Sequence, residues 1–280
     1  MKSSIELLPL LEVLKSAVYS SYLEKDKSFS VIIIADPELN KTKTLMKFAK
    51  MPKVSVQSDL TYYGIVEELL PKIKQGDMRT IIIPDMLKAI LKKQSTSNNF
   101  ITILNSMIEE GVFDVTLRNT KNFGGARCNI MTSVTPNIYF DNRKFWNKIG
   151  FFSRIIPFSY SYTDDRIADV FKSIGKYNVQ NGSVDSQLPI YSTQIALPEK
   201  FADVAEDIAK IIGEKEKVIF KTRLGSEVTL KGSKGFRHKW QLQSMLKSFA
   251  LMRGSFKVEK TDVDKLKFVS RWLNYDFNPL

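Results

Sequence analysis

Short runs of β-branched apolar residues alternate with amphipathic stretches along the first part of the chain. The runs at Val31–Ile34, Arg79–Ile83 and Ile155–Tyr162 are too short for typical helices and predict buried strands. Ile5–Tyr22 and Ile65–Ile73 have helical periodicity. Strands that alternate with helices in this way predict an α/β fold with a mainly parallel sheet.

Weaker signals fill the spaces between these elements. They predict a short strand at Lys53–Gln57, a polar loop at Lys92–Asn99 and a helix at Ile101–Ile108. An extended segment at Val112–Leu117, a basic glycine-containing tip at Asn119–Gly125 and a returning strand at Arg127–Val134 follow. The last three segments together indicate a hairpin or a strand-loop-strand excursion.

The strand signal fades after residue 162, where helical periodicity dominates. The predicted helices are Asp164–Ile174, Pro198–Ile212, Arg237–Met252 and Asp262–Leu273. Residues 217–232 could form a small hairpin, and the loop at 177–189 is the best candidate for a linker. We therefore predict an α/β core at residues 1–162, which includes an N-terminal helix, and a smaller, mostly helical domain at 163–280.

Charge and cysteine content narrow the setting of the protein. The 42 Lys and Arg residues exceed the 30 Asp and Glu residues by 12, which favours a polyanionic partner such as nucleic acid or an acidic membrane surface, although the protein could simply be basic. No window is apolar enough for a membrane span, so we expect no membrane partner. The single cysteine, Cys128, excludes an internal disulfide and predicts a reducing, cytoplasmic compartment.

The turn after the first strand has the register of a phosphate-binding loop. Its eight residues are Ala35, Asp36, Pro37, Glu38, Leu39, Asn40, Lys41 and Thr42. Backbone N–H groups of such a loop surround an anion, a lysine neutralises it, and a hydroxyl holds magnesium. Lys41 and Thr42 would supply the last two groups.

This loop departs from the usual glycine-rich pattern at two positions, Ala35 and Asn40. The residue before the lysine often needs a positive φ, and Asn is the non-glycine residue that tolerates it best. The alternative is that Lys41, Lys43 and the lysines after them form a solvated basic helix face.

A second candidate lies at the end of the strand Arg79–Ile83, where Asp85 follows Pro84. Phosphoryl transfer needs an acid here to hold magnesium, usually followed by a glutamate that orients water. Met86 occupies the glutamate position. Asp85 is either the magnesium acid, with the base absent, or a shifted base with Pro84 in the first position, or the cap of the next helix.

The order of these parts resembles an AAA+ ATPase, and most closely the branch of minichromosome-maintenance (MCM) helicases and MoxR-type ATPases. The opening Ala35-Asp36-Pro37 is similar to the Gly-Asp-Pro of MCM loops. Glu109–Val112 and Arg127–Ile130 resemble the flanks of the β-hairpin that carries basic residues to DNA in that family. The resemblance thereby implies a P-loop core with a helical lid, and assigns Arg118 and Lys121 to DNA binding.

Three further residues receive roles from this resemblance. Thr135, or else Asn137, corresponds to the polar residue that reaches the γ-phosphate. Arg154, in Phe152-Ser153-Arg154-Ile155, resembles the arginine finger that is given to a neighbouring subunit's nucleotide. Arg237, at the start of a lid helix, corresponds to the sensor-2 arginine. Each arginine could instead form a surface salt bridge.

The resemblance implies binding of ATP and Mg²⁺, assembly into a homo-oligomeric ring or filament, and action on DNA as a helicase, loader or motor. Asn40 and Met86 leave the ATP hydrolase activity open, so an alternative is an AAA+ scaffold that binds nucleotide and DNA but hydrolyses little. A third interpretation is a MoxR-like remodeller of a protein partner.

Other residues that could take part in binding or catalysis have simpler structural interpretations. His238 is the only histidine and has no evident zinc-binding partners. Tyr160 and Tyr162 could stack on bases, but buried structural aromatics are the simpler interpretation.

Overall fold

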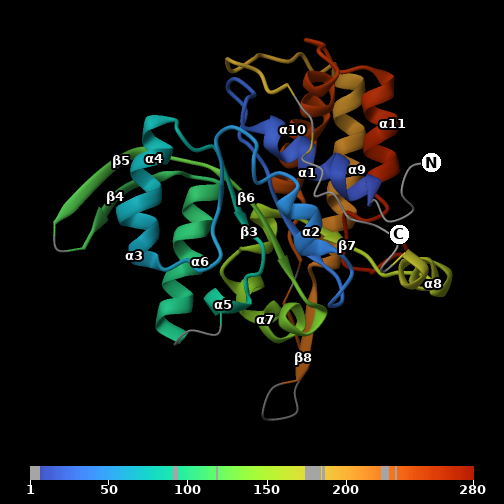
Figure 1. Ribbon diagram of the computed structural model, residues 1–280, viewed down its shortest axis with the longest axis horizontal. Coiled ribbons are helices and arrows are strands. Elements are labelled where there is room, and N and C mark those ends of the chain that lie inside the picture. The colour runs from blue at the N-terminus through green and yellow to red at the C-terminus, as the bar shows by residue number, and fades with distance from the viewer. Residues whose placement is uncertain are drawn as a thin grey trace.

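A five-stranded parallel sheet lies at the centre of the protein (Figure 1). The computed structural model describes residues 7–90, 94–117, 119–173, 184, 187–221, 227–230 and 232–280 of the 280-residue chain. The strand order is β2-β3-β6-β1-β7, and every neighbouring pair is parallel. The bounds are β1 Ser30–Ile34, β2 Val54–Val56, β3 Thr80–Ile83, β6 Asn129–Val134 and β7 Ile155–Ser159. The α/β class and the parallel sheet are as predicted.

Side-chain alternation along the strands builds two separate apolar cores. Val31 and Ile33 of β1 point to one core, whereas Ile32 and Ile34 point to the other. All four side chains are buried because β1 lies inside the sheet with a helical layer on each face. A continuous β-branched run is the sequence signature of such a strand.

Helices from both ends of the chain cover the first face. They are α1 (Leu8–Ser20), α2 (Lys41–Met46), α9 (Glu199–Lys215), α10 (Phe236–Met252) and α11 (Lys260–Val269). Because α1 packs directly on α10 and α11, both sides of the predicted boundary at residue 162 contribute to the same core. The division into two domains stays a prediction.

The middle of the chain covers the second face. Its helical segments are α3 (Tyr62–Gly64), the π-helical turn η1 (Ile65–Leu69), α4 (Leu70–Gln75), α5 (Leu87–Ile90), α6 (Gln94–Ile108) and α7 (Pro136–Lys148). The 3₁₀ turn η2 (Phe152–Arg154) leads into β7, and α8 (Asp164–Ser173) follows β7.

The predicted polar loop at Lys92–Asn99 is wrong from Gln94 onward, where α6 already begins. Ser, Thr and Asn have low helix propensity, which is why the segment indicates a loop. Once the apolar part of α6 is held in the core, each preceding residue adds one backbone hydrogen bond at little cost. Helix α7 lies in a segment for which the sequence analysis predicted no element.

The excursion after α6 is a hairpin, but its second strand differs from the prediction. Strand β4 (Val112–Thr116) pairs antiparallel with β5 (Thr120–Ala126), the segment expected to be the tip. The expected return strand at Arg127–Val134 is instead β6 of the main sheet. Gly111 closes the base of the hairpin, since a Cβ there would lie 2.4 Å from the Gly125 carbonyl oxygen.

The last part of the chain contains a second hairpin. The predicted hairpin near residues 217–232 is formed by β8 (Val218–Lys221) and β9 (Glu227–Leu230). Within the described ranges, no helix has both the length and the apolar character needed to cross a membrane. The linker candidate at 177–189 lies largely outside the described residues.

Candidate nucleotide site and the paired arginines

Three candidate segments meet at the carboxyl edge of the sheet. The loop follows β1, Thr135 follows β6, and Asp85 follows β3 after one residue. Because β6 lies between β1 and β3, and all three are parallel, their carboxyl ends lie side by side. The Ala35 amide donates to the Val134 carbonyl at 3.4 Å, which joins the start of the loop to β6. Such an edge is a common place for a ligand in an α/β fold.

The backbone of the loop has the conformation that its sequence only suggested. Asn40 has φ 61° and ψ 14°, in the left-handed region, immediately before α2 begins at Lys41. Glu38 also has a positive φ, of 67°. Asn therefore takes the conformation for which Gly is otherwise selected. This supports the interpretation of Asn40 as a mild departure from the phosphate-loop pattern.

Lys41 folds back into the loop instead of pointing to solvent. Its residue is 9% exposed, and Nζ donates to the carbonyl oxygens of Ala35 at 2.6 Å and Asp36 at 2.5 Å. Burial lowers the pKa of Lys41, and the carboxylates of Asp36 and Asp85 oppose this shift. An ammonium with two of its three hydrogens already committed keeps one for an anion. Lys41 is therefore not part of a solvated basic helix face, which was the alternative interpretation of this segment.

Two tyrosines at the end of β7 hold the loop from its other side. The Tyr160 hydroxyl donates to the Leu39 carbonyl, and Asn40 Nδ2 donates to the Tyr162 hydroxyl at 3.4 Å. Tyr160 is fully buried, and burial raises its pKa, so the hydroxyl keeps the proton it donates. The sequence analysis treated both as structural aromatics and missed this contact with the loop. The alternation in Phe158-Ser-Tyr-Ser-Tyr162, which places these aromatics on one side of the strand, was the available signal.

The candidate magnesium ligands are Thr42 and Asp85, and both are exposed. Asp85 Oδ1 accepts a hydrogen bond from the Leu87 amide at 2.8 Å, so Asp85 does cap the following helix. Its second carboxylate oxygen stays available. No cluster of three or more His, Cys, Asp or Glu side chains suited to a metal ion occurs among the described residues. One hydroxyl and one carboxylate fit Mg²⁺ only when phosphates and water supply the other ligands, which is the usual arrangement for this ion.

Position 86 offers no catalytic base, because the thioether of Met86 cannot take a proton from water and the side chain is fully buried. Thr135 begins α7 in an extended conformation and makes no capping hydrogen bond with its side chain. Its half-buried hydroxyl is free to bind a ligand at the edge.

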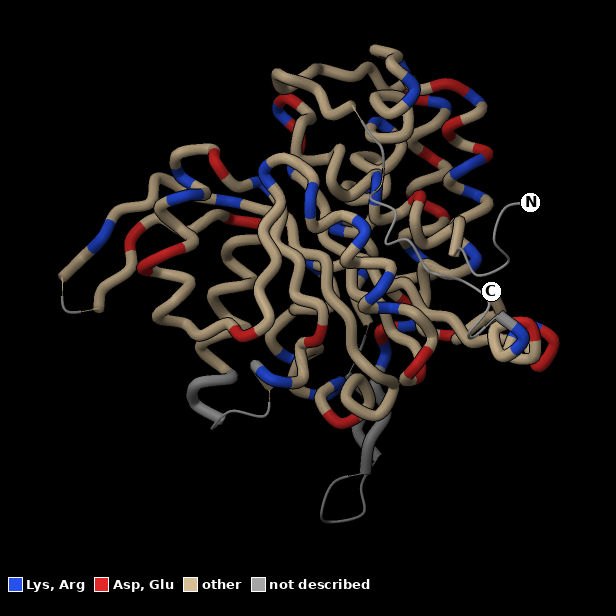
Figure 2. The backbone as a smooth tube through the Cα atoms, viewed as in Figure 1, with Lys and Arg blue, Asp and Glu red and all other residues tan. Residues whose placement is uncertain are grey.

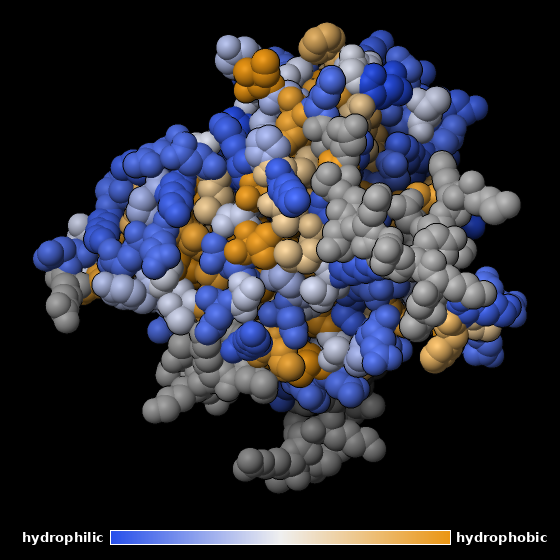
Figure 3. Space-filling model, viewed as in Figure 1, coloured by the Kyte–Doolittle hydropathy of each residue, from blue (hydrophilic) through white to orange (hydrophobic). Residues whose placement is uncertain are grey.

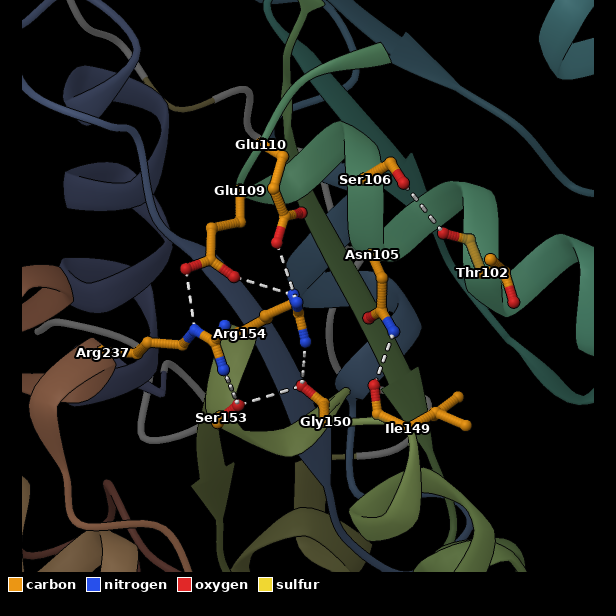
Figure 4. Close-up of polar contacts among 10 residues, drawn as sticks. All are labelled: Thr102, Asn105, Ser106, Glu109, Glu110, Ile149, Gly150, Ser153, Arg154 and Arg237. Carbon is orange, nitrogen blue, oxygen red and sulfur yellow. Dashed lines mark hydrogen bonds and ion pairs between the residues drawn. The ribbon is translucent and has the colours of Figure 1, made fainter. Parts of the chain in front are cut away.

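The two candidate arginines converge on one carboxylate, Glu109 at the end of α6 (Figure 4). Arg237 Nε lies 2.7 Å from Glu109 Oε1, and Arg154 Nε lies 2.7 Å from Oε2. The second contact is an ion pair without hydrogen-bond geometry, since both of its atoms lack a properly aligned partner. Arg237 Nη1 also donates to the Ser153 hydroxyl at 3.2 Å.

Arg154 has two further partners. Nη2 binds Glu110 Oε1 at 2.8 Å, and Nη1 donates to the Gly150 carbonyl at 3.0 Å. Gly150 has φ 70°, and a Cβ there would lie 2.6 Å from Arg154 Nη1, so glycine makes room for the guanidinium. Burial raises the pKa of Glu110, but the hydrogen bond and the charge of Arg154 outweigh it, and the net shift is downward.

This cluster lies at the edge of the sheet opposite the loop. Arg154 immediately precedes β7, whereas Lys41 follows β1, and β1 and β7 run parallel. Arg237 is tied to Glu109 and Ser153 at the same edge as Arg154. The structure therefore brings Arg154 and Arg237 together but brings neither to the loop of its own chain.

The structure describes only one of the two proposed DNA-binding residues, Lys121. Lys121 on β5 forms an ion pair with Glu67 across the face of the hairpin. Arg118 lies outside the described residues. The sequence analysis placed Glu109 at a hairpin flank and missed its part in binding the arginines, because that requires residues 128 positions apart.

Comparisons with known proteins add no further assignment: no family model matches the chain, and no curated protein matches it significantly.

Proposed function

We propose that this protein is an AAA+-type nucleotide-binding protein that assembles into an oligomer and acts on DNA. The observation that carries the proposal is the loop after β1, where Asn40 in the left-handed conformation directs Lys41 back into the turn. Thr135 and Asp85 follow strands β6 and β3 at the same edge, and this arrangement supports the proposal. The five-stranded parallel sheet with its helical layers is compatible with a P-loop core.

In this proposal each residue at the edge has a simple task. Lys41 directs its remaining N–H to the terminal phosphates, and Thr135 donates its hydroxyl to the outermost one. The Tyr160 and Tyr162 hydroxyls keep the loop in its binding conformation. Magnesium, when bound with ATP, would neutralise charge that develops on the phosphates, and Thr42 and Asp85 are the residues that would hold it.

Slow hydrolysis is part of this proposal. Met86 is buried where a water-orienting glutamate is expected, and one oxygen of Asp85 is committed to the Leu87 amide. Helix α2 has only six residues, so its dipole adds little to phosphate binding. These features favour a protein that binds nucleotide but turns it over slowly.

Arg154 contributes to hydrolysis only across a subunit boundary, since it lies at the edge opposite its own loop. A guanidinium that reaches a neighbour's γ-phosphate stabilises the developing charge and makes activity depend on assembly. Arg154 would then have to exchange Glu109 and Glu110 for phosphate oxygens, which adds a further reason for slow turnover.

The experiment is ATP binding by the full chain, measured by calorimetry with Lys41→Ala and with Lys50→Ala as the matched control. Lys50 is an exposed lysine that follows α2. Loss of one charge-assisted hydrogen bond should weaken binding at least about tenfold in Lys41→Ala and leave Lys50→Ala unchanged. Equal affinity in all three proteins would refute the nucleotide site. Steady-state hydrolysis with and without DNA then separates a motor from a slowly hydrolysing scaffold.

A further inference from the structure

A basic cavity lies at the amino edge of the sheet, on the side opposite the loop. Its volume is about 420 Å³, and its walls come from the segments around α1, α4 and β5. Lys27, Arg79 and Arg127 precede strands β1, β3 and β6 respectively, and Lys74 lies on α4. Because the strands are parallel, residues that precede them gather at one edge. The tertiary structure thus brings four cations together that are scattered in the sequence.

The positive charge of this cavity has no compensation within the described part of the chain. Asp26 is the only carboxylate among the described residues of its wall, and Lys247 Nζ already binds both Asp26 oxygens, at 2.7 and 2.9 Å. None of the four cations pairs with a carboxylate of a described residue. The cavity therefore presents a surplus of positive charge to an incoming ligand.

The contacts that these four cations make leave some of their N–H donors free to bind an anion. Lys74 Nζ donates to the Asn122 carbonyl at 3.1 Å, and Arg79 Nη1 donates to the Ser21 carbonyl at 2.7 Å. Lys27 Nζ lies 4.6 Å above the Trp240 ring. The exposed Arg127 side chain makes no polar contact with a described residue. Each cation keeps donors for an anion, and only Arg79 is fixed by several contacts.

Apolar side chains form part of the remaining wall, beside three serines and Asp26. Met78 and Phe123 are buried side chains that line the cavity, together with backbone of Gly124 and Gly125. A concave site of this volume suits a small ligand unit with a charged and an apolar part. Arginine and lysine match phosphate oxygens, the serine hydroxyls match a sugar, and the apolar part of the wall matches a base.

We propose that the basic cavity binds a nucleotide phosphate, either free or as one unit of a nucleic-acid strand. The inference rests on the nucleic-acid part of the proposed function and is independent of ATP binding at Lys41. The basic cavity offers unpaired cations, whereas Lys121 on the hairpin is neutralised by Glu67. Along the described backbone, Lys and Arg are otherwise spread over all parts of the fold (Figure 2). Lys27 and Ser28 also line the small cavity beside Arg154 and Arg237, so the two cavities adjoin along this edge.

The test is fluorescence anisotropy of the full chain with a labelled oligothymidylate of about 12 nucleotides, a length typical of single-strand sites. The variant is Lys74→Ala plus Arg127→Ala, because Lys74 makes one exposed hydrogen bond and Arg127 makes no side-chain polar contact with a described residue. The matched control, Lys260→Ala plus Lys267→Ala, removes two exposed lysines around α11 that do not line the cavity. Unlabelled thymidine monophosphate and inorganic phosphate, as competitors, distinguish a free nucleotide from a strand.

We expect the cavity variant to bind the strand about tenfold more weakly, with a salt slope lower by about 1.4, since each phosphate contact contributes about 0.7 for single strands. The control variant should bind like the wild type. Competition by the monophosphate at concentrations where inorganic phosphate has no effect would identify a nucleotide-sized site. Equal weakening in the cavity variant and the control would overturn the cavity assignment and leave DNA binding intact. Failure of the wild type to bind any of the three probes would overturn both.

Discussion

Arg154 Nε lies 2.7 Å from Glu109 Oε2, so the arginine that the resemblance assigns to a neighbour's nucleotide contacts a carboxylate of its own chain. The same carboxylate binds Arg237. Glu109 is thereby the residue that fixes both guanidinium groups at the amino edge of the sheet. Their side chains are 15% and 42% exposed, so Arg154 depends most on this neutralisation.

The change Glu109→Gln leaves two guanidinium groups without their shared negative charge. We expect the free energy of unfolding to fall by about 1–3 kcal/mol, the usual cost of leaving a half-buried charged donor poorly paired. Urea denaturation measures the loss. The control is Glu110→Gln, whose side chain is 50% exposed and should cost about 0.5 kcal/mol or less. Equal losses in the two variants would contradict the central position of Glu109.

A mixing experiment tests action of Arg154 across a subunit boundary. Lys41→Ala and Arg154→Ala should each lack ATP hydrolysis alone, since every site in a pure assembly has lost one group. In a mixture, the intact loop of one variant can meet the intact Arg154 of the other, so part of the activity should return. Steady-state phosphate release across mixing ratios measures this effect, and a mixture as inactive as its components would exclude the proposed role.

The left-handed conformation of Asn40 predicts an unusual order of substitutions. Asn40→Gly should change the free energy of unfolding by less than about 0.5 kcal/mol, because glycine adopts φ near 61° without strain. Asn40→Val should lose about 1–2 kcal/mol or more, since its Cβ approaches the following carbonyl oxygen. Thermal and urea unfolding can rank the two variants. A more stable valine variant would show that the loop does not keep this conformation in solution.

Glu206 predicts an acid-dependent contact between α9 and α10. Hydrogen bonds from Lys210 and Lys239, together with their charges, lower the pKa of Glu206 to about 2. Its pKa in the unfolded chain is about 4.3, so the contribution to stability is complete above that value and is lost as the pH falls toward about 2. The urea midpoint of Glu206→Gln should lie below that of the wild type at about pH 6, and the two should converge near pH 2.

The matched control for this pH dependence is Asp203→Asn. It removes an exposed carboxylate of the same helix that has no ion pair with a described residue. Its midpoint should follow the wild type at every pH. A constant difference between Glu206→Gln and the wild type from neutral to acid pH would contradict the lowered pKa.

The partners of buried polar side chains could not be predicted from the sequence. His238 is the only histidine and has no metal-binding pattern, which is as far as its sequence context leads. In the fold it is fully buried between Glu216 Oε1, 2.5 Å from Nε2, and Gln241 Oε1, 2.9 Å from Nδ1. Glu216 comes from a different segment, so this structural role depends on how α9 and α10 meet. On the face seen in Figure 3, hydrophobic residues lie in several groups separated by hydrophilic residues.

The sequence by itself determined the elements whose causes are local. The run Val31–Ile34 indicates a buried strand because its β-branched residues are apolar at every position, and Asn before Lys41 indicates a turn with positive φ. Helix α6 was only partly predicted, since packing extended it through a polar segment.

Only the tertiary structure decided which of these elements are neighbours. Strand order brought Thr135 between the loop and Asp85, and the same parallel order separated Arg154 and Arg237 from Lys41. It also gathered the four cations of the basic cavity from segments far apart in the chain. Periodicity reports which face of an element is buried, but the partner of that face is set by packing among residues distant in sequence, and that packing positions the charged groups.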